Sequence, residues 1–351
     1  MKLYQIVEIT GKNNDAGTKA TQDAAQIAEK MGFIPVPIKM CTTRDSKVAK
    51  LERQIGYWMD WKKAYQSIEK EAVVLLQDPF HHQQLTREKM LRKLKADKKA
   101  KYISLVHDVE ELRKFRYSDY YRHEFDVMME LADVLIVHNE KMADFFRMRG
   151  VSEEKLVVLE IFDYLQDLRE HSTPKFEQKL IVAGNLDTKK CGYIGQLSQL
   201  KKVDIQLYGP NFDPKMRNCA NIRYGGSLAP DEVPEKLTGG FGLVWDGDSI
   251  DGCQGDAGQY LKYNNPHKLS LYLSSGLPVV IWSGAAEADF VEKNKVGVTV
   301  DSLYQLSARM EKMTAQQYAE YAQNAEKLAE KLRAGFYLKK ALTEAMDKIR
   351  G

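Results

Sequence analysis

The amino-acid sequence predicts an α/β protein of two doubly wound domains that face each other across a central cleft. Short apolar segments alternate with amphipathic segments along the whole chain, which is typical of parallel sheets built from β-α-β units. The length of 351 residues suits two domains of about 170 residues each. A polar stretch at 166–174 separates the two series of segments and is the predicted linker.

The first domain is predicted to span residues 1–165, with strands at 3–9, 33–38, 72–76, 102–106, 134–137 and 156–159. Its first helix carries Ala20, Ala24, Ile27 and Met31 on one face, at spacings of four, three and four. The second domain is predicted to span residues 175–320, with strands at 179–183, 203–208, 241–245, 278–281 and 296–300. The remaining residues, 321–351, are expected to form C-terminal helices that cross back and pack at the domain junction.

The composition excludes several classes of protein. A net charge of +3 and the absence of a zinc-finger or stacked-aromatic motif argue against a nucleic-acid partner. The four cysteines form no CxxC pair, which disfavours a disulfide framework or a structural zinc site. No segment approaches the roughly 18 apolar residues of a membrane span, and the N-terminus reads as a strand rather than a signal peptide. We therefore expect a cytoplasmic protein that meets a membrane, if at all, at its inner face.

The loop between the first strand and the first helix, residues 11–18, contains Gly17 and Thr18. Glycine allows close approach of the backbone to a ligand, and the N-terminus of a helix offers free N–H groups to an anion. The loop is neither a GxGxxG nor a Walker motif, which disfavours a dinucleotide enzyme. It is either a phosphate contact or an ordinary turn in which Thr18 caps the helix.

The most informative segment is 263–280, which reads YNNPHKLSLYLSSGLPVV. It predicts a short helix that begins at Pro266 or His267 and ends at Gly276, followed by a buried strand. Lys268 then lies in the first turn, where its charge opposes the helix dipole. A bound diphosphate would supply the compensating charge; the alternative is a solvated lysine.

This segment resembles the nucleotide-sugar site of GT-B glycosyltransferases, through Asn-Pro-x-Lys at 265–268 and Gly-x-Pro-Val-Val at 276–280. The whole chain is similar to the bacterial glucosyltransferases that extend N-acetylglucosamine on serine-rich adhesins, and to their β-1,6-galactofuranosyltransferase-like relatives. Gly17-Thr18, Gly-Asn-Leu at 184–186 and Leu-Tyr-Gly-Pro at 207–210 carry the likeness in order. The chain departs from many retaining GT-B enzymes in having no glutamate at 269–273, which leaves the ribose contact and the donor preference open.

The resemblance implies two Rossmann-like domains and transfer of a hexose, glucose or galactofuranose, from a UDP-sugar to a glycan acceptor. The acceptor would be a glycoprotein or a lipid-linked saccharide, and no cofactor other than the donor substrate is expected. The implied diphosphate contacts are Asn265, His267 and Lys268, with Gly17 and Thr18 from the first loop. Lys189, beside Lys190, is a further phosphate candidate. Tyr208 would lie beside the uracil, or would otherwise be a core tyrosine.

The Asp-x-Asp at 246–248 is the kind of motif that holds a divalent metal in single-domain GT-A enzymes. GT-B enzymes usually stabilise the leaving diphosphate with basic residues and helix dipoles, which this sequence also provides. We therefore expect no metal and interpret 246–252 as an acidic loop of the cleft that meets sugar hydroxyls.

For acid–base chemistry the first domain offers Asp78, His81 and His107, each just after a predicted strand. One of them should be essential if the reaction inverts the configuration at the reacting carbon of the sugar. If the reaction retains this configuration, no single side chain needs to act as an essential base. A structural role is the alternative for each histidine. Two other functions stay open for the chain: a non-catalytic partner subunit of a transferase, and a UDP-sugar epimerase of the same fold.

Basic and aromatic residues gather at 87–101 and 113–123. Such a patch either contacts an anionic membrane surface or is a solvated helix face. Self-association into a homo-oligomer is also left open by the sequence.

Overall fold

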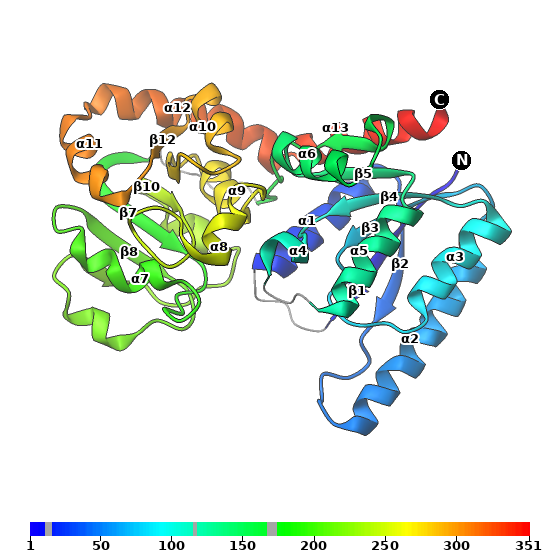
Figure 1. Ribbon diagram of the computed structural model, residues 1–351. Helices are drawn as coiled ribbons and strands as arrows, with labels where there is room; N and C mark the ends of the chain where they lie inside the picture. Colours follow the sequence, from blue (N-terminus) through cyan, green and yellow to red (C-terminus); the bar gives the residue numbers. More distant parts are fainter. Residues whose placement is uncertain (11–15, 115–117, 167–173) are drawn as a thin grey trace.

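The computed structural model describes residues 1–10, 16–114, 118–166 and 174–351. Most of the predicted linker, and residues 11–15 of the first loop, therefore lie outside the described residues. The described chain forms two α/β domains (Figure 1). Each domain has one parallel six-stranded sheet. The predicted fold class is confirmed.

The first sheet has the strand order β2-β1-β3-β4-β5-β6. Its strands are β1 (Leu3–Ile9), β2 (Ile34–Lys39), β3 (Val73–Asp78), β4 (Lys101–Val106), β5 (Val134–Val137) and β6 (Leu156–Val158). The central strands are rich in Val, Leu and Ile and are buried almost throughout, because helices cover both faces of a parallel sheet. The order reverses at β1, so the loops after β1 and β3 diverge at the carboxyl edge of the sheet.

The second sheet has the order β12-β11-β10-β7-β8-β9. Its strands are β7 (Lys175–Ala183), β8 (Asp204–Tyr208), β9 (Ile222–Tyr224), β10 (Gly239–Val244), β11 (Val279–Trp282) and β12 (Gly297–Val300). The sequence did not predict β9, since its three residues, Ile-Arg-Tyr, do not form an apolar run, unlike the Leu-Val-Val of the equally short β6.

Helices fill the connections between the strands (Figure 1). Those of the first domain are α1 (Ala16–Lys30), α2 (Lys47–Ser67), α3 (Arg87–Lys98), α4 (Glu110–Arg113), α5 (Asp119–Leu131) and α6 (Glu140–Met148). Those of the second are α7 (Gly192–Gln196), α8 (Gly255–Tyr260), α9 (His267–Ser274), α10 (Ala288–Asn294) and α11 (Leu306–Lys312). Within the described ranges, none of the helices combines the length and the apolarity needed to cross a membrane.

Two C-terminal helices, α12 (Ala315–Arg333) and α13 (Phe336–Arg350), join the domains. Helix α12 packs on the second domain, where the Tyr318 hydroxyl donates to the Gly240 carbonyl at 2.7 Å. Helix α13 returns to the first domain, beside β5 in Figure 1. The Asp163 carboxylate accepts the backbone N–H groups of Tyr337 and Leu338 there, which satisfies free donors at the start of α13.

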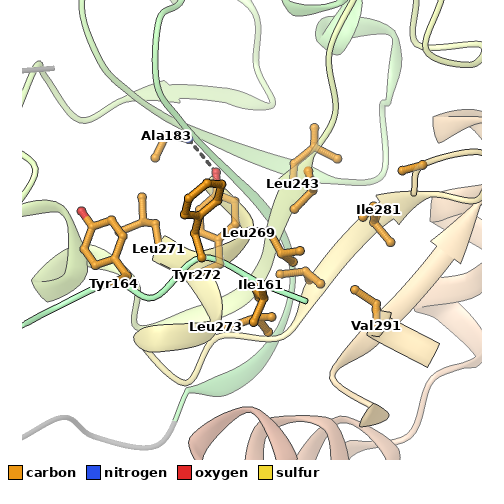
Figure 2. Close-up of a cluster of buried hydrophobic side chains, with 14 of the residues drawn as sticks. Ile161, Tyr164, Ala183, Leu243, Leu269, Leu271, Tyr272, Leu273, Ile281 and Val291 are labelled. Atoms are coloured by element: carbon orange, nitrogen blue, oxygen red, sulfur yellow. Dashed lines mark hydrogen bonds between the residues drawn. The ribbon is translucent and has the colours of Figure 1, made fainter. Parts of the chain in front are cut away.

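Helix α9 is almost entirely buried and organises the second domain. It begins after Pro266 and ends before Gly276, whose φ of +68° suits the left-handed residue that follows many helices. Figure 2 shows the Tyr272 ring in the apolar cluster, with its hydroxyl accepting the Ala183 N–H at 2.8 Å. The ring lies flat against Gly242, where an added Cβ would come within 2.2 Å of it. Helix α9 is thereby fixed against β7 and β10.

We predict that Tyr272→Phe lowers the free energy of unfolding by about 1–3 kcal/mol, because the buried Ala183 N–H loses its acceptor while the packing stays the same. Chemical denaturation measures this change. Tyr304→Phe is the matched control, since it removes a tyrosine hydroxyl from a half-exposed side chain. Equal stabilities of the two variants would contradict the role of the Tyr272 hydroxyl.

Candidate active site

A cavity of about 440 Å³ lies between the two domains, at the carboxyl ends of both sheets. Asp108 follows β4, Asn185 follows β7 and Asp246 follows β10, so three strand ends converge on it. Its walls also include Arg113, Lys190, Tyr260 and Asn264. The cavity is therefore lined by side chains of both charge signs and by both domains.

Lys268 lies in the first turn of α9, as predicted, and its ammonium group reaches the end of β10. The Nζ atom donates to the Trp245 carbonyl at 2.8 Å and is 3.7 Å from the Asp246 carboxylate. Asp246 therefore balances part of the charge that opposes the helix dipole, for which the sequence interpretation offered only a bound diphosphate or solvent. The Lys268 side chain keeps 22% of its surface accessible.

Contacts across the cavity connect the loop after β4 to α8. The Tyr260 hydroxyl donates to the Asp108 carboxylate at 3.2 Å and accepts the Val109 N–H at 3.0 Å. Asp108 is also paired with Arg113. At the rim, Lys114 and Asp256 form an exposed ion pair of 3.1 Å. These contacts hold the first-domain wall of the cavity at a fixed distance from the second domain.

His138, directly after β5, positions the start of α9. Its Nε2–H donates to the Val106 carbonyl, and its Nδ1 accepts the N–H of Asn265, both at 2.9 Å. Only the neutral imidazole with the proton on Nε2 makes both bonds. Burial lowers the pKa of His138 to about 4, so this form persists at neutral pH. The segment that precedes Lys268 is thus held by a histidine of the other domain.

Asn139 uses all of its side-chain hydrogen-bonding groups at the same junction. Its oxygen caps α6 through the Met142 N–H, and its amide nitrogen donates to the Tyr263 carbonyl at 3.0 Å and to Glu287 at 2.8 Å. Glu287 is 1% exposed. Burial raises the pKa of its carboxyl to about 8, against the opposing effect of the Asn139 hydrogen bond.

Asn265 and His267 belong to the junction and do not line the cavity. The Asn265 side-chain amide donates to the Glu160 carbonyl at 3.1 Å. The His267 ring packs against Tyr164, with 5.0 Å between ring centroids, and burial lowers its pKa to about 4. Its Nε2 is buried and has no hydrogen-bond partner among the described residues. Asn264, one residue earlier, lines the cavity instead.

The other predicted nucleotide contacts are dispersed. Gly17 and Thr18 lie in the first turn of α1, and Thr18 lines a separate cavity of about 250 Å³ within the first domain. Lys189 is exposed, whereas its neighbour Lys190 lines the interdomain cavity. Tyr208 ends β8 half-buried, its ring against Gly225, where an added Cβ would lie 2.2 Å from it. Their contacts to a ligand stay predictions.

The three predicted acid–base residues occupy different surroundings. Asp78 accepts a hydrogen bond from Ser104, and burial raises the pKa of its carboxyl. His81 lines the first-domain cavity, with Nδ1 3.2 Å from the Glu8 carboxylate. His107 donates from Nε2 to Gln77 at 2.7 Å, and burial lowers its pKa to about 3. Of these three residues, none lines the interdomain cavity; Asp108 does.

The sequence interpretation missed His138, Asn139 and Glu287 as site residues. The first two follow directly after β5, so the rule that selected Asp78 and His107 would also have found them. Glu287 carries no local signal, because its burial depends on the docking of the first domain. No group of three or more His, Cys, Asp or Glu side chains is placed to hold a metal ion in the part of the chain that the structure describes.

We predict that Glu287→Gln removes a pH-dependent loss of stability. The unfolded carboxyl ionises near 4.5, whereas the folded one keeps its proton until about pH 8. The free energy of unfolding therefore falls as pH rises between these values, by at most about 1.4 kcal/mol per pH unit from this group. Glutamine keeps the acceptor for Asn139 and does not titrate.

Denaturation midpoints from pH 5 to pH 8.5 measure this effect. Glu287→Gln should show the flatter profile, while the exposed Glu52→Gln control keeps the wild-type slope. Parallel profiles for wild type and Glu287→Gln would show that Glu287 is ionised at neutral pH.

Comparisons with known proteins agree with this architecture. The model of the glucosyltransferase 3-like N-terminal domain matches residues 3–161, and that of the C-terminal domain matches residues 180–345. Beta-1,6-galactofuranosyltransferase WbbI of Escherichia coli (strain K12) is 31% identical over 361 residues, covering 99% of each chain. Glucosyltransferase 3 of Streptococcus gordonii is 26% identical over 331 residues, covering 94% of each.

The solved structure of Anabaena Alr3699/HepE in complex with UDP and glucose has the same fold, with a TM-score of 0.60 at 13% identity, over 99% of each chain. The resemblance drawn from the sequence motifs is confirmed. The chain belongs to the glucosyltransferase 3-like family, and it is a hexosyltransferase with the two-domain GT-B fold.

Proposed function

We propose that this hexosyltransferase transfers glucose or galactofuranose from a UDP-sugar to a glycan acceptor, with the donor in the interdomain cavity. The observation that carries the proposal is a cavity between two doubly wound domains that Lys190, Asn264 and Asp246 line, with the Lys268 ammonium group next to Asp246. A volume of about 440 Å³ falls in the range of about 300–1,000 Å³ that is usual for ligand sites. The relatives named above carry the two candidate sugars in their names.

The donor diphosphate would lie near the Lys268 ammonium group, which is next to the end of β10. A phosphate oxygen there would take over the role that the Asp246 carboxylate plays for this ammonium group. Lys190, on the wall formed by the loop after β7, would add a second positive charge. As the bond to the sugar breaks, both charges stabilise the leaving UDP. The solved UDP–glucose complex of a protein with the same fold supports a UDP-sugar as donor.

The acceptor would approach from the first domain. Its cavity of about 250 Å³ presents Glu8, Thr18, Gln77 and His81, which are suited to hydrogen bonds with sugar hydroxyls. Asp108 connects this side to the donor, because it lines the interdomain cavity two residues after β4. A carboxylate there can accept the proton of the acceptor hydroxyl, and Arg113 and Tyr260 hold it in place.

We predict that Lys268→Ala weakens UDP binding about 10- to 150-fold, which corresponds to a charge-assisted contact of about 1.5–3 kcal/mol. Uridine, which has no phosphate, should bind both proteins equally. Calorimetric titration of UDP and uridine measures this difference, with thermal melting to verify the fold. Lys236→Ala, an exposed lysine of the same domain, is the control. Unchanged UDP affinity in the folded variant would place the diphosphate elsewhere, nearest Lys189 and Lys190.

We predict that one first-domain group among Asp78, His81, His107 and Asp108 controls turnover, and the cavity favours Asp108. Asp108→Asn should lower kcat about 10²- to 10⁴-fold, as expected for loss of a general base. The affinity for UDP should stay within a factor of a few. UDP release in the presence of acceptor gives kcat, and calorimetry gives the affinity. If no variant of the four changes kcat by more than a few-fold, the first domain only positions the acceptor.

A further inference from the structure

Helix α2 of the first domain carries an apolar stripe on its exposed side, formed by Val48, Leu51, Ile55, Trp58 and Met59. The spacings of three, four, three and one place these residues on one face of the helix. Leu85 extends the stripe, because its N–H donates to the Gln54 side chain of α2 at 3.0 Å. These six residues are between 45% and 69% exposed. We call them the α2 stripe.

The α2 stripe is not required for the core of the domain. The opposite face of α2 already supplies Tyr57, Trp61 and Ala64, which are at most 2% exposed. Trp61 is further fixed by donating its indole N–H to Gln84 at 2.7 Å. Ser46 caps the N-terminus of the helix by accepting the Ala49 N–H. The helix is therefore stable with its second apolar face exposed, which is unusual for a surface helix.

The charges around the α2 stripe are mainly positive. Residues 44–63 contain six basic and three acidic side chains. The Lys62 ammonium group lies 5.4 Å from the centre of the Trp58 ring, so a cation and an aromatic side chain stand together at the edge of the stripe. An apolar face with basic flanks and a tryptophan at the border is the pattern of helices that lie in the interface of an anionic membrane.

The neighbouring helix α3, part of the basic region that the sequence singled out, uses several of its cations in contacts within the domain. Arg87 is paired with Glu124, and Arg92 with Glu88 and Glu130. Lys95 binds Asp133, and Lys98 donates to the Tyr65 and Ile68 carbonyls at the end of α2. These side chains hold α3 to the rest of the domain.

We propose that the α2 stripe is a docking surface for an anionic lipid bilayer. The stripe would enter the boundary between headgroups and acyl chains, while Lys47 and Lys62 contact lipid phosphates. A second copy of the chain is a poorer occupant, because pairing two stripes about a twofold axis brings their basic flanks together. An anionic surface complements the same flanks.

Hydrogen bonds connect helix α2, which carries the α2 stripe, to the first-domain cavity. Gln54 of α2 donates to the Gln83 carbonyl, and the adjacent Gln84 donates to Glu8, which lines that cavity. A bilayer on the stripe would therefore lie beside the cavity that receives the acceptor. A lipid-linked acceptor would present its sugar there; this last step rests on the proposed function, whereas the docking does not.

Co-sedimentation of the full chain with vesicles of phosphatidylcholine containing phosphatidylglycerol tests the docking. The wild type should bind these vesicles, bind pure phosphatidylcholine more weakly, and shift its Trp58 emission to shorter wavelength. The triple variant Leu51→Ser, Ile55→Ser, Trp58→Ser should lose at least about tenfold in affinity. The control replaces Met148, Tyr304 and Phe336, which are exposed at other sites, with serine and should bind like the wild type.

A charge variant, Lys47→Glu with Lys62→Glu, keeps the proposal testable if the triple variant does not fold. It should lose binding to anionic vesicles at low salt. The proposal is overturned if the wild type binds no vesicles, or if both variants bind as the wild type does. It is also overturned if light scattering shows a wild-type oligomer that the triple variant dissociates and no vesicle binding, because the stripe is then a contact between copies. Transfer to a soluble acceptor is assayed separately, so failure of docking and failure of the proposed function are distinguishable.

Discussion

The geometry of the candidate active site depends on the contact of His138 and Asn139 with the second domain. The two residues leave the end of β5 and between them bond to Asn265, Tyr263 and Glu287. Buried polar groups that lose a partner are costly, so this set of bonds permits one arrangement of the described segments. Because Asn265 immediately precedes Pro266, the start of α9 is fixed relative to the first domain. Lys268 then reaches the end of β10, next to Asp246 of the cavity wall.

Several charged groups in and beside the interdomain cavity are paired with one another in this structure. Lys268 is close to Asp246, Arg113 is paired with Asp108, and Lys114 with Asp256. A diphosphate entering the cavity must therefore compete with carboxylates for these cations. The gain in binding free energy is smaller than it would be for an unpaired lysine. The cations are already oriented, however, so little side-chain entropy is lost on binding. The acidic loop at 246–252 holds Lys268 in place through Asp246, and this role requires no metal.

Local sequence patterns were sufficient to predict the fold and the start of α9. They were insufficient to predict the direction in which individual side chains point. Runs of Val, Ile and Leu identified the strands apart from β9, and Pro266 with Gly276 bounded α9 to within two residues. The Lys268 ammonium group reaches Asp246, which lines the cavity, because its own helix turn directs it there. Asn265 and His267 stand in the same motif but turn toward Glu160 and Tyr164, which lie in the segment before the linker. Their direction is set by the docking of that segment, which no local pattern encodes.

Phe162, in the segment before the linker, packs among three neutral histidine side chains. His107 stacks on its ring at 5.2 Å, and the rings of His138 and His267 approach edge-on at 5.1 and 6.4 Å. Burial lowers the pKa of each histidine from 6.5 to between about 3 and about 4. Their contribution to stability is therefore complete above pH 6.5 and is lost as the pH falls toward those values. Glu287 acts in the opposite direction, since its contribution is lost as the pH rises toward 8. Between pH 6.5 and 8 the three imidazoles stay neutral. Among these four residues, the pH dependence of stability in this range therefore comes from Glu287, which is hydrogen-bonded to Asn139.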